Sequence, residues 1–138
     1  MSSTVIPTMR YADAHAAIDF LTAAFGFSAD LVVAEGEVVY HAQLRHGSGM
    51  VMLGSGSEED GGFGDHVSSQ TAGVKPVGSV YVVVDDVDGH AEAARAAGAK
   101  IVMEPEEQEY GGSVYTCLDP QGGVWSFGSY DPWAEAAE

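Results

Sequence analysis

The chain carries one sequence pattern twice. Residues 41–54 (HAQLRHGSGMVMLG) and residues 115–128 (YTCLDPQGGVWSFG) align without a gap at a spacing of 74 positions, which is 115 minus 41. In each copy a strand-like segment and a helical pattern precede the match, and the two helices end at Gly26 and Gly98. A single unit of this kind cannot bury its own sheet, so the two copies must share a core. The sequence therefore predicts two similar halves with a pocket at their junction.

Length and composition are those of one folded domain. The 138 residues are 46% hydrophobic, and no apolar run approaches the roughly 20 residues that cross a bilayer. The one cysteine, Cys117, excludes an internal disulfide and is typical of a reducing compartment. No secretory pattern is found at the start of the sequence. We therefore expect a cytoplasmic protein without a membrane partner.

The charge balance restricts the partners further. The formal net charge is −16, from 21 acidic and 5 basic residues. Such a surface repels a phosphate backbone, so nucleic acid is excluded as an expected partner. The same field keeps the protein soluble and attracts cationic ligands.

Secondary-structure signals predict the order βαβββ in each half. The first unit has a strand over 4–10, a helix from the cap Asp13 to Gly26, and strands over 27–34, 38–46 and 50–54. The second has a strand over 79–84, a helix from Asp85 or Asp86 to Gly98, and strands over 99–103, 113–118 and 124–128. The segment between them is rich in Gly, Ser and acid and has no period. The predicted fold is α+β: one domain over 1–138, with module 1 at about 4–54, a linker over 55–77 and module 2 at about 78–130.

Strand alternation indicates which strand side chains point away from the helices, toward an inner face. Val80, Val82 and Val84 form a helix-facing row, so Tyr81 points the other way. The inner face predicted in this way mixes apolar and polar groups, as a ligand pocket does. With Phe63 of the linker and Tyr110 beside a turn, the predicted ligand-binding residues are Thr8, Arg10, His41, Gln43, Met52, Phe63, Tyr81, Tyr110, Tyr115 and Ser126.

Several of these residues keep two interpretations. His41 either orients a ligand or is a hydrogen-bonded, partly buried histidine, and Arg10 needs either an internal carboxylate or an anionic ligand group. Tyr110 and Tyr115 either line the pocket mouth or pack a hairpin. Asp119 is interpreted as a turn-forming carboxylate before Pro120. We expect Cys117 to be a small wall residue, because no positive neighbour in sequence lowers its pKa.

The chain resembles the vicinal oxygen chelate superfamily, which includes glyoxalase I, extradiol dioxygenases and bleomycin-resistance proteins. Three segments carry the resemblance: MRYADAHAAIDFLTAAFG from Met9, the start of the second unit over 80–98, and DPQGGVWSFG from Asp119. The resemblance implies that the two βαβββ modules form a cupped, mostly antiparallel sheet with helices on the outer face. It also implies a homodimer.

The resemblance further implies where a divalent metal would be bound. Family enzymes use one residue on the first strand and one on the fourth strand of each module, and these positions are Ile6, Met52, Ser79 and Ser126. In metal-using members they are His, Glu or Gln. Aliphatic and thioether side chains do not suit such ions, and neutral hydroxyls bind them weakly. We therefore expect no metal and no other cofactor.

Two functions follow from the resemblance. The first is a metal-independent binding protein of the glyoxalase/bleomycin-resistance type, which sequesters a drug or metabolite of cationic or aromatic character in the inter-module cavity. The second is a metal-dependent lyase, isomerase or dioxygenase of the same superfamily with atypical ligands, for example His41 and His66 with linker carboxylates. The ligand pattern favours binding over catalysis.

Overall fold

A computed structural model describes residues 3–55, 63 and 66–136 of the chain. Most of the predicted linker before residue 66 therefore lies outside the described residues. The elements are β1 (Thr8–Tyr11), α1 (Ala14–Phe25), β2 (Ser28–Glu35), β3 (Val38–His46), β4 (Gly49–Ser55), β5 (Val80–Val83), α2 (Val87–Ala96), β6 (Lys100–Glu107), β7 (Ser113–Leu118), β8 (Val124–Gly128) and α3 (Pro132–Ala136).

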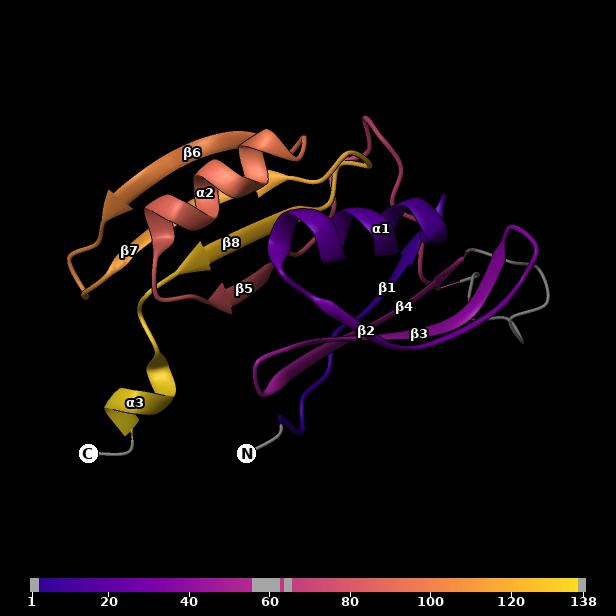
Figure 1. Cartoon of the computed structure of the whole chain (residues 1–138), viewed down its shortest axis with the longest axis horizontal. Coiled ribbons are helices and arrows are strands. Elements are labelled where there is room, and N and C mark those ends of the chain that lie inside the picture. The colour runs from indigo at the N-terminus through magenta and orange to yellow at the C-terminus, as the bar shows by residue number, and fades with distance from the viewer. Residues whose placement is uncertain (1–2, 56–62, 64–65, 137–138) are drawn as a thin grey trace.

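The strands form two four-stranded sheets with the same internal order. The orders are β1-β4-β3-β2 and β5-β8-β7-β6, so each βαβββ unit makes its own sheet. The pairs β1–β4 and β5–β8 are parallel, and the other pairs are antiparallel. One helix lies against each sheet (Figure 1). This arrangement confirms the α+β prediction and the repeated unit.

The predicted helix ends are confirmed by their caps. The Asp13 side chain accepts a hydrogen bond from the Ala16 N–H at 3.0 Å, and α1 ends at Gly26 with φ of 84°, where a left-handed backbone favours glycine. Asp86 caps α2 in the same way, accepting from the Gly89 N–H. Helices α1 and α2 therefore begin at predicted cap residues, and α1 ends at the predicted glycine.

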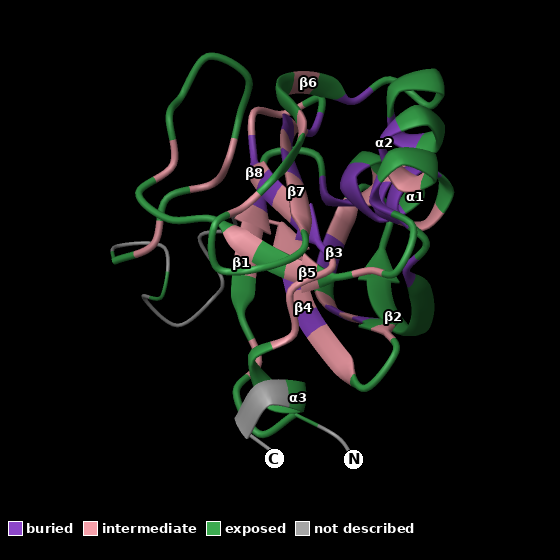
Figure 2. Ribbon diagram, turned by 90° about the vertical axis from the view of Figure 1, so that its left-hand side faces the viewer, coloured by how far each residue is buried: buried purple, intermediate pink, exposed green. Residues whose placement is uncertain are grey.

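The helix sides of the two modules share one core. Phe25 of α1 packs against Trp125 and Phe127 of β8, with ring centroids 5.5 and 4.7 Å apart, and α1 also contacts α2. The buried residues lie where the helices meet the two sheets (Figure 2). The faces of the sheets that look away from the helices are more exposed, and we call them the open faces of module 1 and module 2.

The ungapped alignment of the two copies is wrong in one strand. Ala42 pairs with Leu53 in module 1, whereas Tyr115 pairs with Phe127 in module 2. Leu53 and Phe127 are both buried on the helix side, so Tyr115 corresponds to Ala42 and not to His41. The second hairpin is one residue longer than the first. Tyr115, Cys117 and Asp119 therefore lie on the helix side and not on the inner face, where the sequence had placed them.

Within the described residues, no helix combines the length and apolar character that crossing a membrane requires.

Candidate functional site

A cavity of about 420 Å³ lies on the open face of module 1. Its described lining residues come from β1, β3 and β4 and the residues beside them, together with Phe63: Thr8, Met9, Arg10, Val38, Val39, Tyr40, His41, Met52, Leu53, Gly54, Ser55 and Phe63. Of the predicted ligand-binding residues, five meet here: Thr8, Arg10, His41, Met52 and Phe63. Parallel pairing of β1 with β4 brings Thr8 beside Met52, which explains why segments distant in sequence share one wall.

His41 and Gln43 form a polar pair at this site. They are two residues apart on β3, so both side chains leave the same face of the sheet. His41 Nε2 lies 2.8 Å from Gln43 Oε1, and both residues are half-buried. When Nε2 carries the proton, Nδ1 is left to accept a hydrogen bond. Gln43 thus orients the imidazole that lines the cavity.

Arg10 brings a positive charge to the same cavity. Its Nη2 donates a hydrogen bond to the Ser55 carbonyl oxygen at 2.9 Å, and its guanidinium carbon lies 5.2 Å from the centroid of the Phe63 ring. Stacking over an aromatic face suits a guanidinium group. Arg10 and Phe63 therefore stack against each other and form one part of the cavity wall.

Tyr81 and Ser126 lie on module 2, apart from this cavity. Ser126 Oγ is 2.7 Å from Thr116 Oγ1 across β7 and β8, and the Tyr81 hydroxyl donates to the Tyr130 carbonyl oxygen at 2.7 Å. Burial of Tyr81, with Tyr110 nearby, raises the pKa of its phenol. The open face of module 2 thus carries hydroxyl groups beside an aromatic ring. Sequence reasoning missed Thr116, because the ungapped alignment put it on the helix side.

The structure also has a cavity of about 280 Å³ at the module junction. It lies on the helix side, and its described lining includes none of the predicted ligand-binding residues: Ala12, Asp13, Ala16, Ala17, Phe20, Thr71, Ala72, Asp119, Pro120 and Gln121. The predicted inner-face residues therefore do not surround one inter-module cavity within a single chain. Thr8, Arg10, His41 and Met52 of module 1 line the larger cavity, Gln43 lies beside it, and the predicted residues of module 2 lie elsewhere.

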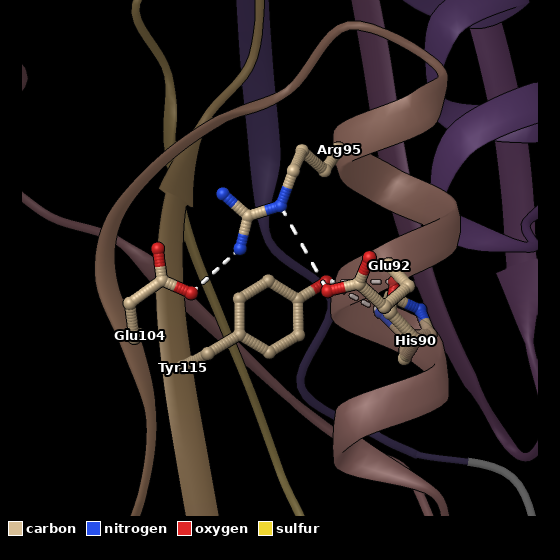
Figure 3. A network of polar contacts seen from close by, with 5 residues as sticks. All are labelled: His90, Glu92, Arg95, Glu104 and Tyr115. Atoms are coloured by element: carbon tan, nitrogen blue, oxygen red, sulfur yellow. Dashed lines mark hydrogen bonds and ion pairs between the residues drawn. The ribbon is translucent and has the colours of Figure 1, made fainter.

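The two remaining predicted tyrosines differ in their environments. Tyr110 is exposed, and its ring packs edge-on against Tyr130 with centroids 5.0 Å apart. Tyr115 is fully buried and points from β7 to α2, where its hydroxyl lies 2.5 Å from His90 Nδ1 (Figure 3). Burial raises the pKa of the Tyr115 phenol. Tyr115 is thus part of the core.

His90 joins the two modules. Its Nε2 lies 3.1 Å from the Phe25 carbonyl oxygen of module 1 and its ring is 4.3 Å from that of Phe127, so the neutral imidazole donates to Phe25 and accepts from Tyr115. Burial lowers the pKa of His90 and, at the end of β3, that of His46. On the outer side of the same helix, Arg95 reaches Glu104 of β6 at 2.6 Å (Figure 3).

Asp119 makes the second inter-module connection. Its Oδ2 accepts from the Tyr11 hydroxyl of module 1 at 2.6 Å and from Trp125 Nε1 at 3.0 Å, and its Oδ1 accepts from the backbone N–H groups of Gln121 and Gly123. Burial and the adjacent carboxylate raise the pKa of Tyr11. Asp119 thus forms the turn that the sequence predicted. Its contact with Tyr11 had no sequence signal, since the two residues are 108 positions apart.

Cys117 has the chemistry of a core residue. It lies on β7 and is fully buried, and burial with the nearby Asp119 carboxylate raises its pKa to about 12. At neutral pH the thiol stays protonated, and the thiolate is the nucleophilic form. The side chain therefore packs and does not react.

The four positions that correspond to family metal ligands do not fit a divalent ion. Met52 and Ser126 lie on β4 and β8 of different modules, while Ile6 and Ser79 precede β1 and β5. One aliphatic, one thioether and two hydroxyl side chains are a poor donor set for such an ion. Among residues 3–55, 63 and 66–136, no three His, Cys, Asp or Glu side chains are grouped as metal ligands.

The comparisons with known proteins define the family. The chain belongs to the Glyoxalase/Bleomycin resistance protein/Dioxygenase superfamily, whose family model matches residues 5–127. An uncharacterized protein of Mycobacterium bovis is 32% identical over 123 residues, which are 88% of this chain and 80% of that protein.

Solved structures agree with this assignment. TioX from Micromonospora sp. ML1 superposes with a TM-score of 0.71 at 32% identity, covering 91% of this chain and 94% of TioX. Glyoxalase I from Zea mays superposes with a TM-score of 0.68 at 21% identity, covering 89% of this chain and 43% of the maize chain. The likeness to the maize enzyme shows the shared fold alone.

Proposed function

We propose that this protein is a metal-independent small-molecule-binding protein of the glyoxalase/bleomycin-resistance type, which sequesters a drug or metabolite. The observation that carries the proposal is the cavity on module 1. Its walls are mainly apolar, its polar groups Arg10 and His41 are held by neighbours, and Met52 occupies the position of a family metal ligand. Sequestration requires affinity alone, so it needs neither a metal nor a nucleophile.

The lining favours a flat, aromatic ligand. Tyr40 and Phe63 offer ring faces, and the Met52 thioether contacts such rings favourably. The net charge of −16 adds a field that attracts a cationic ligand, while Nδ1 of His41 offers an acceptor to its polar substituents. We therefore expect an aromatic ligand with a positive charge distant from Arg10.

We further propose that the working form is a homodimer. Module 2 of the same chain cannot move over the cavity without breaking the connections made by Asp119 and His90. Its open face carries exposed apolar side chains, Tyr81, Val83 and Met103. A second copy can bring this face to the cavity of module 1, and the same contact repeated by a two-fold axis closes the pair.

A dye titration tests ligand binding. The cationic aromatic dye acridine orange is titrated by fluorescence against the wild type, Met52→Trp and Val32→Trp. Met52→Trp fills the cavity, and we expect it to weaken binding about ten-fold or more, whereas Val32 faces the helix side of β2 and its variant should match the wild type. Equal affinity in all three proteins would contradict the assigned site.

Elemental analysis tests the independence from metal. The protein is incubated with Ni²⁺, Zn²⁺, Mn²⁺ and Fe²⁺, desalted and analysed. We expect a metal content near zero, because the donor set suits none of these ions. A ratio near one metal per chain that is lost in His41→Ala would favour the metal-dependent enzyme instead.

A further inference from the structure

The C-terminal arm, defined as residues 129–134, leaves the body of the protein. It contains the start of α3, and α3 contacts none of the other described helices or strands. Trp133 on this helix is 82% exposed. Trp is the largest apolar side chain, and its indole offers a large contact area to any partner surface that covers it.

The base of the arm is fixed, so its direction is defined. Ser129 donates from its backbone N–H to the Ser113 carbonyl oxygen at 2.9 Å, and its hydroxyl oxygen accepts from the Ser113 N–H at 3.0 Å. Tyr130 accepts from the Tyr81 hydroxyl and packs against the Tyr110 ring. These contacts hold the arm to the end of β8 and point α3 away from the core.

The arm projects on the side of the molecule that α1 and α2 do not cover. In Figure 1 α1 and α2 lie along one side, and α3 lies on the other. The open faces of the sheets also look away from the helices. A second copy seated against those faces therefore meets the arm.

Charge and hydrophobicity indicate which face receives it. The arm contains the acidic residue Asp131 and no basic residue. Two of the three arginines in the chain, Arg10 and Arg45, project from the open face of module 1. Beyond the cavity, that face ends in Gln43, Arg45, Met50 and the 43% exposed Leu31. Arg45 lies 3.0 Å from Asp30 and keeps 58% of its side chain exposed, so it can meet a second carboxylate.

We propose that the arm docks onto the open face of module 1 in a second copy of this chain, with Trp133 on Leu31 and Met50 and Asp131 beside Arg45. Each copy then gives one arm and receives one, and a two-fold pair closes without further partners. The arm covers the end of the face opposite to Arg10 and leaves the cavity to the ligand. This inference rests on the dimer of the proposed function.

The test uses sedimentation equilibrium and tryptophan emission on the full chain. We expect Trp133→Ala and Arg45→Ala to weaken dimerisation about ten-fold or more, and Val32→Ala, an exposed apolar residue on the helix side, to leave it unchanged. The emission of Trp133, taken as the difference between wild type and Trp133→Phe, should shift to shorter wavelength as the dimer forms. Trp133, Arg45 and Val32 are all exposed, so none of these substitutions removes core packing.

Two results would overturn the proposal that the arm docks onto a second copy. One is a dimer whose Trp133 emission stays that of a water-exposed indole, and the other is a chain that remains monomeric at all concentrations. The ligand proposal is judged separately. Absence of acridine orange binding in a dimer with a covered Trp133 would count against the proposed ligand class and not against docking of the arm.

Discussion

The hairpins β3–β4 and β7–β8 occupy equivalent places in the two modules, yet their turns make different contacts. His46 and Asp119 stand at the same position, four residues after Ala42 and Tyr115 respectively. His46 is half-buried and packs edge-on against Phe27 of its own module, whereas Asp119 is buried and binds Tyr11 of the other module. The second turn is one residue longer than the first, and its Asp119 contacts the other module, whereas His46 contacts its own module.

The comparison shows how a repeat can acquire an asymmetric joint. The longer turn wraps around the Asp119 carboxylate, and a side chain on Gly123 would lie 2.5 Å from Asp119 Oδ2 and 2.9 Å from the Tyr11 hydroxyl. Only glycine leaves room there. The paired residues on the open faces differ as well, with Gln43 opposite Met52 in module 1 and Thr116 opposite Ser126 in module 2.

The largest expected effect comes from removing the joint. Asp119→Ala leaves the Tyr11 hydroxyl and the Trp125 N–H buried without their acceptor, so we expect the free energy of unfolding to fall by about 3 kcal/mol or more. His46→Ala at the equivalent position should cost about 1 kcal/mol, because it removes one half-buried ring. Urea unfolding of both variants measures the difference. Equal losses would mean that the two turns are equivalent after all.

A smaller effect is expected from acid. The pKa values of His90 and His46 are lowered below the ordinary 6.5, so the unfolded chain takes up protons first as the pH falls. The free energy of unfolding should therefore be greatest above about pH 6.5 and decrease below it, by at most about 1.4 kcal/mol per pH unit for each histidine.

Unfolding measured between pH 5 and 8 tests this expectation. His90→Gln removes one titrating group, so its profile should be flatter than that of the wild type. His15→Gln serves as the control, because the His15 imidazole bonds to the Gly36 carbonyl oxygen at the surface and not in the core. A wild-type profile without a slope below pH 6.5 would refute the role of the two histidines.

The smallest expected effect concerns the open face of module 2. Thr116→Val breaks the hydroxyl pair with Ser126, but both residues are half-buried, so water can replace the lost partner. We expect the free energy of unfolding to change by less than about 1 kcal/mol. If module 2 of a second copy closes the cavity, acridine orange affinity should fall several-fold in the same variant. Unchanged affinity would limit the site to module 1.

Part of the candidate site was predictable from sequence because strand alternation is local. The parity of β1, β3 and β4 correctly grouped Thr8, Arg10, His41 and Met52, and the cavity confirms that they lie together. The same reasoning was wrong for Tyr115, since parity is lost when a turn gains one residue and every side chain beyond it changes face. His90 and Asp119 were not recognised as joints, because their partners lie 65 and 108 positions away.

The sequence by itself determined the two βαβββ units, the caps that end α1, and the family, because these depend on periodicity and on residues close together in the chain. Only the tertiary structure decided how the units join. Packing of the two helix sides into one apolar core buries the Asp119 carboxylate and the Tyr11 hydroxyl, and the hydrogen bond between them satisfies both groups. That packing leaves the two open faces exposed, with the larger cavity lined by module 1 together with Ser55 and Phe63.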